Sequence, residues 1–413
     1  MFNVFLDNRR QFFVYLSLIV ILSMFYSKFA LSVATILLSA NVILHPNGLT
    51  HVKKVAKKKS WRIFWAILLI YGITIIYSED LSIAFFMGIQ MKLPFLFLPI
   101  VFLSTPGVTK HDLRNILFFF VIVTTLVSIH SFIYYLIHFK EITNELGKGG
   151  SFPLPIQHPR FGLLLAISIF SAIYLHTKNH FWRFNWEKIV LKCCIVLLFA
   201  FLHIVAIRSG LFCFYLAALT IVILSLLKNR RKKRSWLMLA AIITIPILAY
   251  FVIPSLQKKV QYTKYDLEML INGKYSEMPL SDSDRITSIL AGIETIKKYP
   301  IIGVGIGDLR KASEASYQKN FANSVERAKM PHNQFVFVAA FSGIIGLLIF
   351  CCVVAYPLMR KKIYTHFLQL GIVLIFLASF LVEYTLETQL GVTMFVFFSV
   401  LSMRMTEFDL EEK

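Results

Sequence analysis

The most regular feature of this sequence is a succession of long apolar runs separated by short polar segments. Runs such as 116–139 and 333–357 are close to the ~20 apolar residues that a helix needs to cross a bilayer. Lipid offers no partners to backbone polar groups, so runs of this length predict helices. We predict about twelve transmembrane helices, at residues 11–27, 29–45, 61–78, 82–103, 113–138, 159–177, 188–207, 210–227, 235–254, 332–358, 365–382 and 387–404.

One long polar segment, residues 255–331, interrupts this pattern between the ninth and tenth predicted spans. Within it, apolar residues from Ile286 to Ile296 recur at helical spacing, and Pro300 ends the helix. We predict an amphipathic helix on the membrane surface. The fold class is therefore an all-α polytopic membrane protein in three parts. Residues 1–254 form helices one to nine, 255–331 form a loop, and 332–413 form the last three helices and a tail.

Composition and charge support this class and predict its orientation. The chain is 57% hydrophobic and only 16% charged, which excludes a soluble enzyme or a disordered protein. Nineteen Lys and Arg residues lie in one alternate set of short loops and five in the other. By the positive-inside rule, both termini are cytoplasmic and the long loop faces the opposite side of the membrane. The net charge of +21 is thus explained by basic loops on the cytoplasmic side, and we expect no nucleic-acid partner.

We expect neither a metal site nor a cofactor. The five cysteines lie inside apolar runs, partly as adjacent pairs, which make poor metal ligands. No His-x-x-x-His spacing occurs, and the Asp282-Ser283-Asp284 segment sits where a helix cap is expected.

Polar residues that a membrane span tolerates poorly gather at the predicted outer ends of five separate segments. Arginines clamp diphosphates in two-pronged contacts, and a histidine can act as a general base near neutral pH. We therefore predict an outward-facing site for a substrate with a diphosphate and a hydrophobic tail. The candidates are His158 and Arg160, Arg208, Arg285, His332 and Asn333, and Glu383 and Glu387.

Several short motifs, in this order and topology, resemble the O-antigen ligase and O-antigen polymerase superfamily of bacterial inner-membrane glycosyltransferases. They are Arg208-Ser-Gly, the block from Arg285 to Tyr299-Pro300-Ile-Ile-Gly-Val-Gly-Ile-Gly-Asp308, Pro331-His332-Asn333-Gln334-Phe335, and Glu383-Tyr-Thr-Leu-Glu387-Thr-Gln-Leu-Gly391. The resemblance covers about residues 150–391. One departure is Ile289, where the family often has an aromatic residue.

The resemblance implies transfer of a glycan from undecaprenyl diphosphate to an acceptor hydroxyl, on lipid A-core or a similar acceptor glycan, without a metal. By this analogy Arg208 and Arg285 hold the diphosphate as it leaves, and His332 accepts the proton of the acceptor hydroxyl, with inversion at the anomeric carbon. The remaining candidates are implied to bind substrate or to position the arginines through ion pairs: His158, Arg160, Asn333, Glu383 and Glu387.

Other interpretations stay open at this point. A polymerase and a protein O-oligosaccharyltransferase belong to the same superfamily, and fold does not determine the acceptor. A polysaccharide or lipid transporter is an alternative from another class, although it predicts polar residues at the membrane midplane. His332 could be an interfacial cap, Arg208 a snorkelling side chain and Arg285 a solvated charge. Lys92, inside the fourth span, is expected either to bind lipid phosphate or to snorkel outward.

Overall fold

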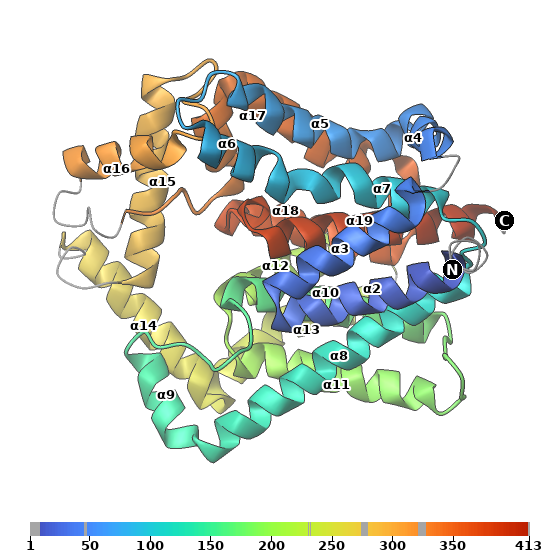
Figure 1. The fold of residues 1–413 in the computed structure, drawn as a ribbon. Helices are drawn as coiled ribbons and strands as arrows, with labels where there is room; N and C mark the ends of the chain where they lie inside the picture. Colours follow the sequence, from blue (N-terminus) through green and yellow to red (C-terminus); the bar gives the residue numbers. More distant parts are fainter. Residues whose placement is uncertain are drawn as a thin grey trace.

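The computed structural model describes residues 9–44, 48–229, 231, 233–273, 280–320 and 328–411. Within these ranges every regular element is helical, which confirms the all-α class. The chain ends, and residues 274–279 and 321–327 of the predicted loop, lie outside the described residues. The α-helices (Figure 1) are α2 (Arg9–Tyr26), α3 (Lys28–Ile43), α4 (Gly48–Lys57), α5 (Lys59–Ile75), α6 (Leu81–Gly88), α7 (Leu93–Ser104), α8 (Lys110–Ile137), α9 (Phe139–Gly147), α10 (His158–Thr177), α11 (Glu187–Ile204), α12 (Arg208–Lys228), α13 (Lys233–Val252), α14 (Pro254–Ile271), α15 (Ser281–Lys298), α16 (Leu309–Asn320), α17 (Gln334–Met359), α18 (Phe367–Val382) and α19 (Gln389–Glu411). Short 3₁₀ turns are η1 (Gln90–Lys92), η3 (Lys361–Thr365) and η4 (Thr385–Glu387).

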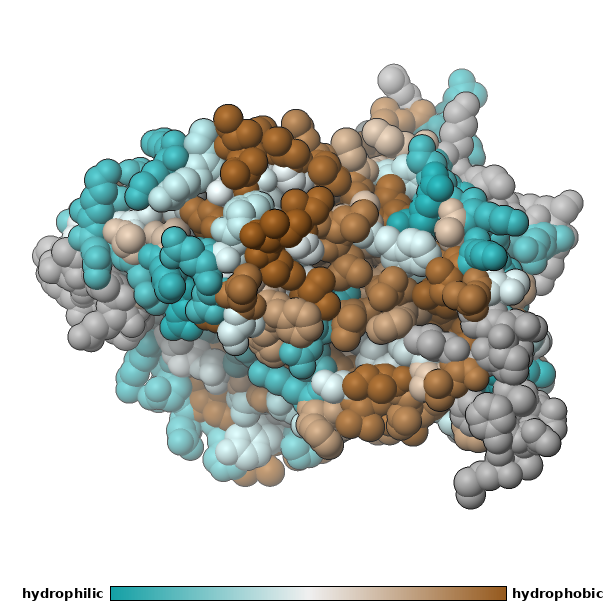
Figure 2. Space-filling model, turned by 45° about the horizontal axis from the view of Figure 1, so that its top comes forward, coloured by the Kyte–Doolittle hydropathy of each residue, from teal (hydrophilic) through white to brown (hydrophobic). Residues whose placement is uncertain are grey.

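Eight helical segments in the described residues are long and apolar enough to cross a membrane. They are α2, the α6–η1–α7 segment, α8, α10, α12, α13, α17 and α19. The other four predicted spans are also helical, as α3, α5, α11 and α18, but the count of twelve crossings stays a prediction. Figure 2 shows apolar surface across the middle of the molecule, with hydrophilic residues gathered toward its two ends.

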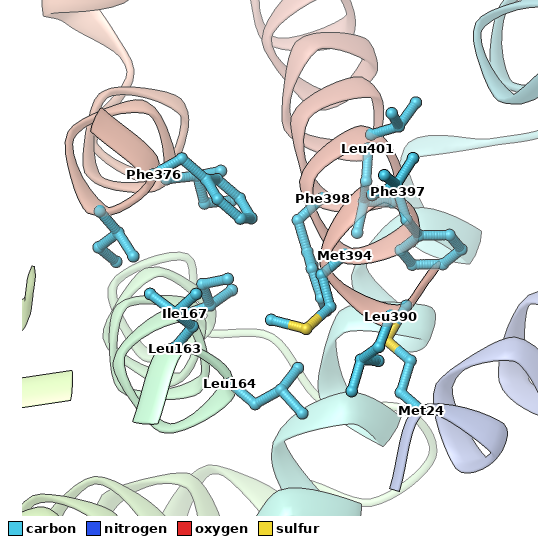
Figure 3. Packing of buried hydrophobic residues seen from close by; sticks show 14 of the residues in the cluster. Met24, Leu163, Leu164, Ile167, Phe376, Leu390, Met394, Phe397, Phe398 and Leu401 are labelled. Atoms are coloured by element: carbon cyan, nitrogen blue, oxygen red, sulfur yellow. The ribbon is translucent and has the colours of Figure 1, made fainter. Parts of the chain in front are cut away.

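The helices α10, α18 and α19 form the centre of the bundle. In Figure 3, Leu163 and Ile167 of α10 lie close to Met394 of α19, and Phe376 of α18 approaches the same cluster. These side chains are at most 1% exposed. Lipid tails are as apolar as these side chains, so close packing of matching surfaces holds the helices together.

The two ends of the bundle carry different polar groups. At one end, Asp409 near the end of α19 is paired with Lys110 at the start of α8, with Lys178 after α10 and with His366 before α18. Arg10 near the start of α2 pairs with Asp112 at 2.8 Å, so the first and last described helices meet α8 at this end. At the other end of the same helices lie Arg160, Glu383 and Thr388, together with α14, α15 and α16 (Figure 1).

The predicted amphipathic helix is present as α15, and its place on a membrane surface stays a prediction. Thr287, Ser288 and Ala291 are at most 3% exposed, whereas Ile286 and Leu290 are 36% and 47% exposed. Small side chains face inward because α15 packs closely against the start of α17. The cap differs from expectation. Asp266 of α14 accepts hydrogen bonds from the backbone N–H groups of Asp282 and Ser283, at 2.7 and 3.1 Å.

The glycine-rich segment after α15, residues 303–307, forms backbone hydrogen bonds with α17, and we call this contact the clasp. That helix is broken at Gly343, whose φ is +65°. The N–H groups of Val304 and Gly305 donate to the carbonyls of Ala340 and Phe341, at 3.1 and 2.9 Å. A Cβ atom on Gly303 would lie 2.3 Å from the Phe341 backbone, so only glycine permits this contact. The clasp supplies partners to carbonyls that the broken helix leaves unpaired.

Candidate functional site

The polar end of the bundle has an ion pair and a histidine at its centre. Arg285, in the first turns of α15, donates to the Glu383 carboxylate at 2.6 Å, and Glu383 is 4% exposed. Ser288 lies one helical turn after Arg285 in α15, and its hydroxyl is 3.1 Å from the Nδ1 atom of His332. The Tyr384 ring meets the His332 ring edge-on at 4.7 Å. Residues from α15, the segment before α17 and the segment after α18 therefore meet at one point.

The surroundings of His332 keep its imidazole neutral. Burial lowers the pKa of His332 to about 3, and the positive charges of Arg285, Lys329 and Arg160 act in the same direction. Burial also raises the pKa of Glu383, against the opposing influence of Arg285 and Arg160. A neutral imidazole can accept a proton, but its basicity is low until negative charge offsets the surrounding arginines and lysine.

Arg160 has an unused hydrogen-bond donor inside this cluster. Its side chain, at the start of α10, is 3% exposed. It donates to the Thr388 hydroxyl at 3.1 Å and to the Tyr384 carbonyl at 3.2 Å, whereas its Nη1 atom has no partner among the described residues. Buried polar groups in native proteins are nearly always hydrogen-bonded, so an unpaired guanidinium N–H indicates a place for an acceptor.

Arg208 lies against the first turn of α15 from the other side. It begins α12, forms an ion pair with Asp282, and donates to the Thr263 and Ser281 hydroxyls at 2.8 and 3.0 Å. Nearby, burial and the Arg208 charge lower the pKa of Lys259 to about 8. Arg208 thus contacts the first residues of α15, and Arg285 lies in the first turns of the same helix.

A crossing of two helices brings together the starts of α10 and α12, which carry Arg160 and Arg208. Each arginine lies two residues before a glycine, Gly162 in α10 and Gly210 in α12. A Cβ atom on Gly210 would be 2.7 Å from the Gly162 Cα atom, so the two backbones are in direct contact. Neither helix start is capped by a side chain. Two uncapped helix N-termini therefore add positive potential beside the arginines.

The other candidates have structural partners. The Asn333 side chain caps α17 by accepting from the N–H groups of Phe335 and Val336, and it donates to the Leu381 carbonyl at 2.8 Å. The His158 ring contacts the Phe152 carbonyl at 2.6 Å and therefore holds the preceding loop. Neither contact involves the cluster around Arg285.

Glu387 belongs to a buried network beneath the cluster. It pairs with Lys92 at 2.9 Å, and it accepts hydrogen bonds from Gln334 at 2.7 Å and from Tyr71. Its partner is thus a lysine and not one of the expected arginines. The expectation that Lys92 binds lipid phosphate or snorkels outward is wrong, because its side chain is fully buried in this pair. A charge within an apolar span was the signal that a carboxylate partner existed.

Sequence reasoning missed several residues of the cluster. Ser288 orients His332, and Thr388 and Tyr384 hold Arg160. Asp282 and Asp284, expected at a helix cap, pair instead with Arg208 and Lys329. Hydroxyl residues at helix ends are too common to single out without the fold, although Tyr384 and Thr388 lie within the motif that begins at Glu383.

The fold and site define a multi-pass helical membrane protein with a cationic polar cluster at one end of its bundle. Residues 193–351 match the family model described as O-Antigen ligase. This match confirms the resemblance seen in the motifs: the segment is similar to the O-antigen ligase family. The matched segment contains Arg208, Arg285 and His332. A comparison of the sequence with curated proteins gives no match.

Proposed function

We propose that this protein transfers a glycan from undecaprenyl diphosphate to an acceptor hydroxyl, on lipid A-core or a similar glycan, at the periplasmic face of a bacterial inner membrane. The basic end around Asp409 faces the cytoplasm in this proposal, since positively charged loops stay on that side. The cluster of Arg160, Arg285 and His332 then faces the periplasm. Membrane lipids surround the bundle, and the reaction uses no metal or cofactor.

The observation that supports this proposal best is the unpaired Nη1 atom of buried Arg160, beside the Arg285–Glu383 pair. Guanidinium groups bind phosphate oxygens through short, charge-assisted hydrogen bonds that are stronger than neutral ones. A diphosphate placed there would also lie near the uncapped starts of α10 and α12. Arg208 would reach the same anion after exchanging its contact with Asp282 for a phosphate oxygen.

The chemistry follows from these positions. The acceptor oxygen attacks the anomeric carbon as its proton passes to His332. The bond between that carbon and the diphosphate oxygen breaks, and the electron pair leaves with the diphosphate, which the arginines stabilise. Attack from the face opposite the leaving group inverts the configuration. Burial lowers the pKa of His332 most, and the charges of Arg285, Lys329 and Arg160 lower it further; an arriving diphosphate offsets these charges and thereby raises the basicity of His332 when donor is bound.

A lipid-facing groove supplies a place for the hydrophobic tail of the donor. A cavity of about 470 Å³ lies between α3, the α6–η1–α7 segment and α19, and it reaches Gln389. Gln389 directly follows Thr388, the hydroxyl partner of Arg160. Its lining combines apolar side chains such as Phe86 and Phe97 with the hydroxyls of Ser32 and Thr35. An apolar chain in this groove would place its diphosphate at the arginine cluster.

Reconstitution with undecaprenyl-diphosphate glycan and a panel of acceptors tests the proposal. Lipid A-core, a second lipid-linked repeat unit and a protein are offered separately, and product size and attachment are measured. Product on lipid A-core supports the ligase. Product only on the lipid-linked repeat or on protein identifies a polymerase or a protein O-oligosaccharyltransferase.

Variants separate catalysis from folding. We expect His332→Ala, Arg208→Gln and Arg285→Gln to lose transfer, while Lys264→Gln, which removes an exposed charge on α14, keeps it. Full transfer by His332→Ala would exclude the proposed base. Loss of transfer in a chelator would exclude metal-independent catalysis, and donor movement without any glycosidic product would indicate a transporter.

A further inference from the structure

A second cavity lies at the opposite end of the bundle, between α5, α17, α18 and α19. It has a volume of about 310 Å³. A narrower slot of about 40 Å³ shares Ser60, Pro357, Gln369 and Met403 with it and extends further along the same helices. The larger cavity opens beside Lys58 and Glu407, near the helix ends that also hold the Asp409 cluster. It is therefore far from the cluster around Arg285.

The slot is apolar and about as deep as one membrane leaflet. It is lined on α18 from Gln369 to Phe380 and on α19 from Met403 to Phe395. At ~1.5 Å per residue, these stretches span about 16 and 12 Å. Half of a ~30 Å hydrocarbon core is about 15 Å. One acyl chain of a lipid in the adjacent leaflet therefore has the right length to occupy the slot.

More cations than carboxylates surround the mouth of the cavity, once Arg404 and Lys54 beside its lining are included. The Glu407 carboxylate is already bound by Lys58 at 3.2 Å, Arg404 at 3.0 Å and the Trp61 N–H at 2.8 Å. Arg360 lines the same mouth and forms no ion pair with any side chain in the described part of the chain.

The charges of Lys54 and Glu411, the other charged residues beside the mouth, do not cancel the excess of positive charge. Lys54 is a further cation near Arg404 and Lys58; its pKa is lowered chiefly by burial and further by these two charges, against the opposing influence of Glu407. Glu411 also lines the mouth, and it offsets only one of these charges. The mouth therefore suits an anionic group.

We infer that this cavity binds one anionic phospholipid, with its headgroup phosphate at Arg360 and Lys58 and one acyl chain in the apolar slot. Basic pockets between transmembrane helices bind such headgroups because phosphate supplies the missing negative charge. The inference is independent of the proposed glycan transfer, since it uses the other end of the bundle.

Native mass spectrometry of the full-length protein in detergent tests this site. The probes are phosphatidylglycerol, phosphatidylcholine with the same acyl chains, and inorganic phosphate. Arg360→Gln removes the unpaired cation, and Arg62→Gln is its control, because Arg62 is an exposed cation of α5 outside the cavity lining. Val373→Phe fills the slot, and Leu374→Phe adds the same bulk one residue along α18, outside the lining.

We expect one phosphatidylglycerol to bind more tightly than phosphatidylcholine, and Arg360→Gln to weaken it about fivefold while Arg62→Gln does not. Val373→Phe should weaken binding of the lipid more than Leu374→Phe. Equal binding of the two lipids, or equal effects within either pair of variants, overturns the inference. Displacement of the lipid by inorganic phosphate also overturns it, because the site would then recognise the anion alone.

Discussion

Replacement of Gly210 by alanine tests how the two arginines at the polar end are positioned. Gly210 contacts Gly162 where α12 crosses α10. Neither glycine carries a side chain that could bind the substrate, so any effect of the substitution must act through the position of the helices. A Cβ atom on Gly210 would lie 2.7 Å from the Gly162 Cα atom, whereas ordinary contact begins near 3.4 Å. The helix starts must therefore separate by about 0.7 Å, and Arg208 must shift relative to Arg160.

This shift should reduce the rate of glycan transfer much more than the stability of the protein. Overpacking costs about 1–3 kcal/mol, and alanine in a helix recovers up to about 1 kcal/mol relative to glycine. The protein should therefore stay folded with a modest loss of stability. A displacement approaching 1 Å at a catalytic site can reduce the rate about 100-fold. We expect Gly210→Ala to lower glycan transfer by about ten- to 100-fold.

The assay combines transfer by the reconstituted protein with thermal unfolding in detergent. Gly72→Ala is the matched control, because the nearest atom to a Cβ on Gly72 is 3.8 Å away, within α5 of the same bundle. We expect this control to keep both activity and stability. Full activity in Gly210→Ala, or an equal loss in Gly72→Ala, would refute the argument that this glycine contact sets the arginine geometry.

Three further predictions concern the histidine and the buried network. Because the His332 pKa is about 3 in the free protein, kcat/KM should stay level between pH 8 and 5. Donor binding should move the acid limb of the kcat profile to higher pH. An inflection of kcat/KM near pH 6.5 that disappears in His332→Ala contradicts this. Ser288→Ala should lower kcat about tenfold with little change in KM, because the serine orients the His332 ring; an unchanged kcat shows that this contact is dispensable. Lys92→Met or Glu387→Gln alone should destabilise the protein by about 3–5 kcal/mol in thermal unfolding, and the double variant by less than the sum; strict additivity means that the pair does not act as one unit.

The gathering of polar residues at one end of the bundle could be predicted from the sequence. Arg160, Arg208 and His332 lie near predicted span boundaries on the side with few basic loops, and Arg285 lies in the long loop on the same side. The structure places them around the start of α15 and the turn before α19. Their catalytic roles stay predictions, tested by the variants proposed above.

Their partners could not be predicted in the same way. Glu383 and Glu387 are four residues apart and chemically alike, yet one pairs with Arg285 and the other with Lys92. Asn333 follows His332 directly, yet it caps a helix and leaves the cluster. The direction in which each side chain points depends on helix ends and 3₁₀ turns that shift by a residue or two without changing the hydropathy pattern.

The order of residues alone indicates that the chain is helical, that it belongs in a membrane, and which loops carry the basic charge. These properties follow from apolar run length and local charge, which act within a segment regardless of its neighbours. The pairing of Lys92 with Glu387, almost 300 residues later, and the contact of Gly162 with Gly210 become visible only in the folded chain. Such contacts depend on which helices pack together, and helix packing in lipid is set by the detailed shape of side chains on both surfaces.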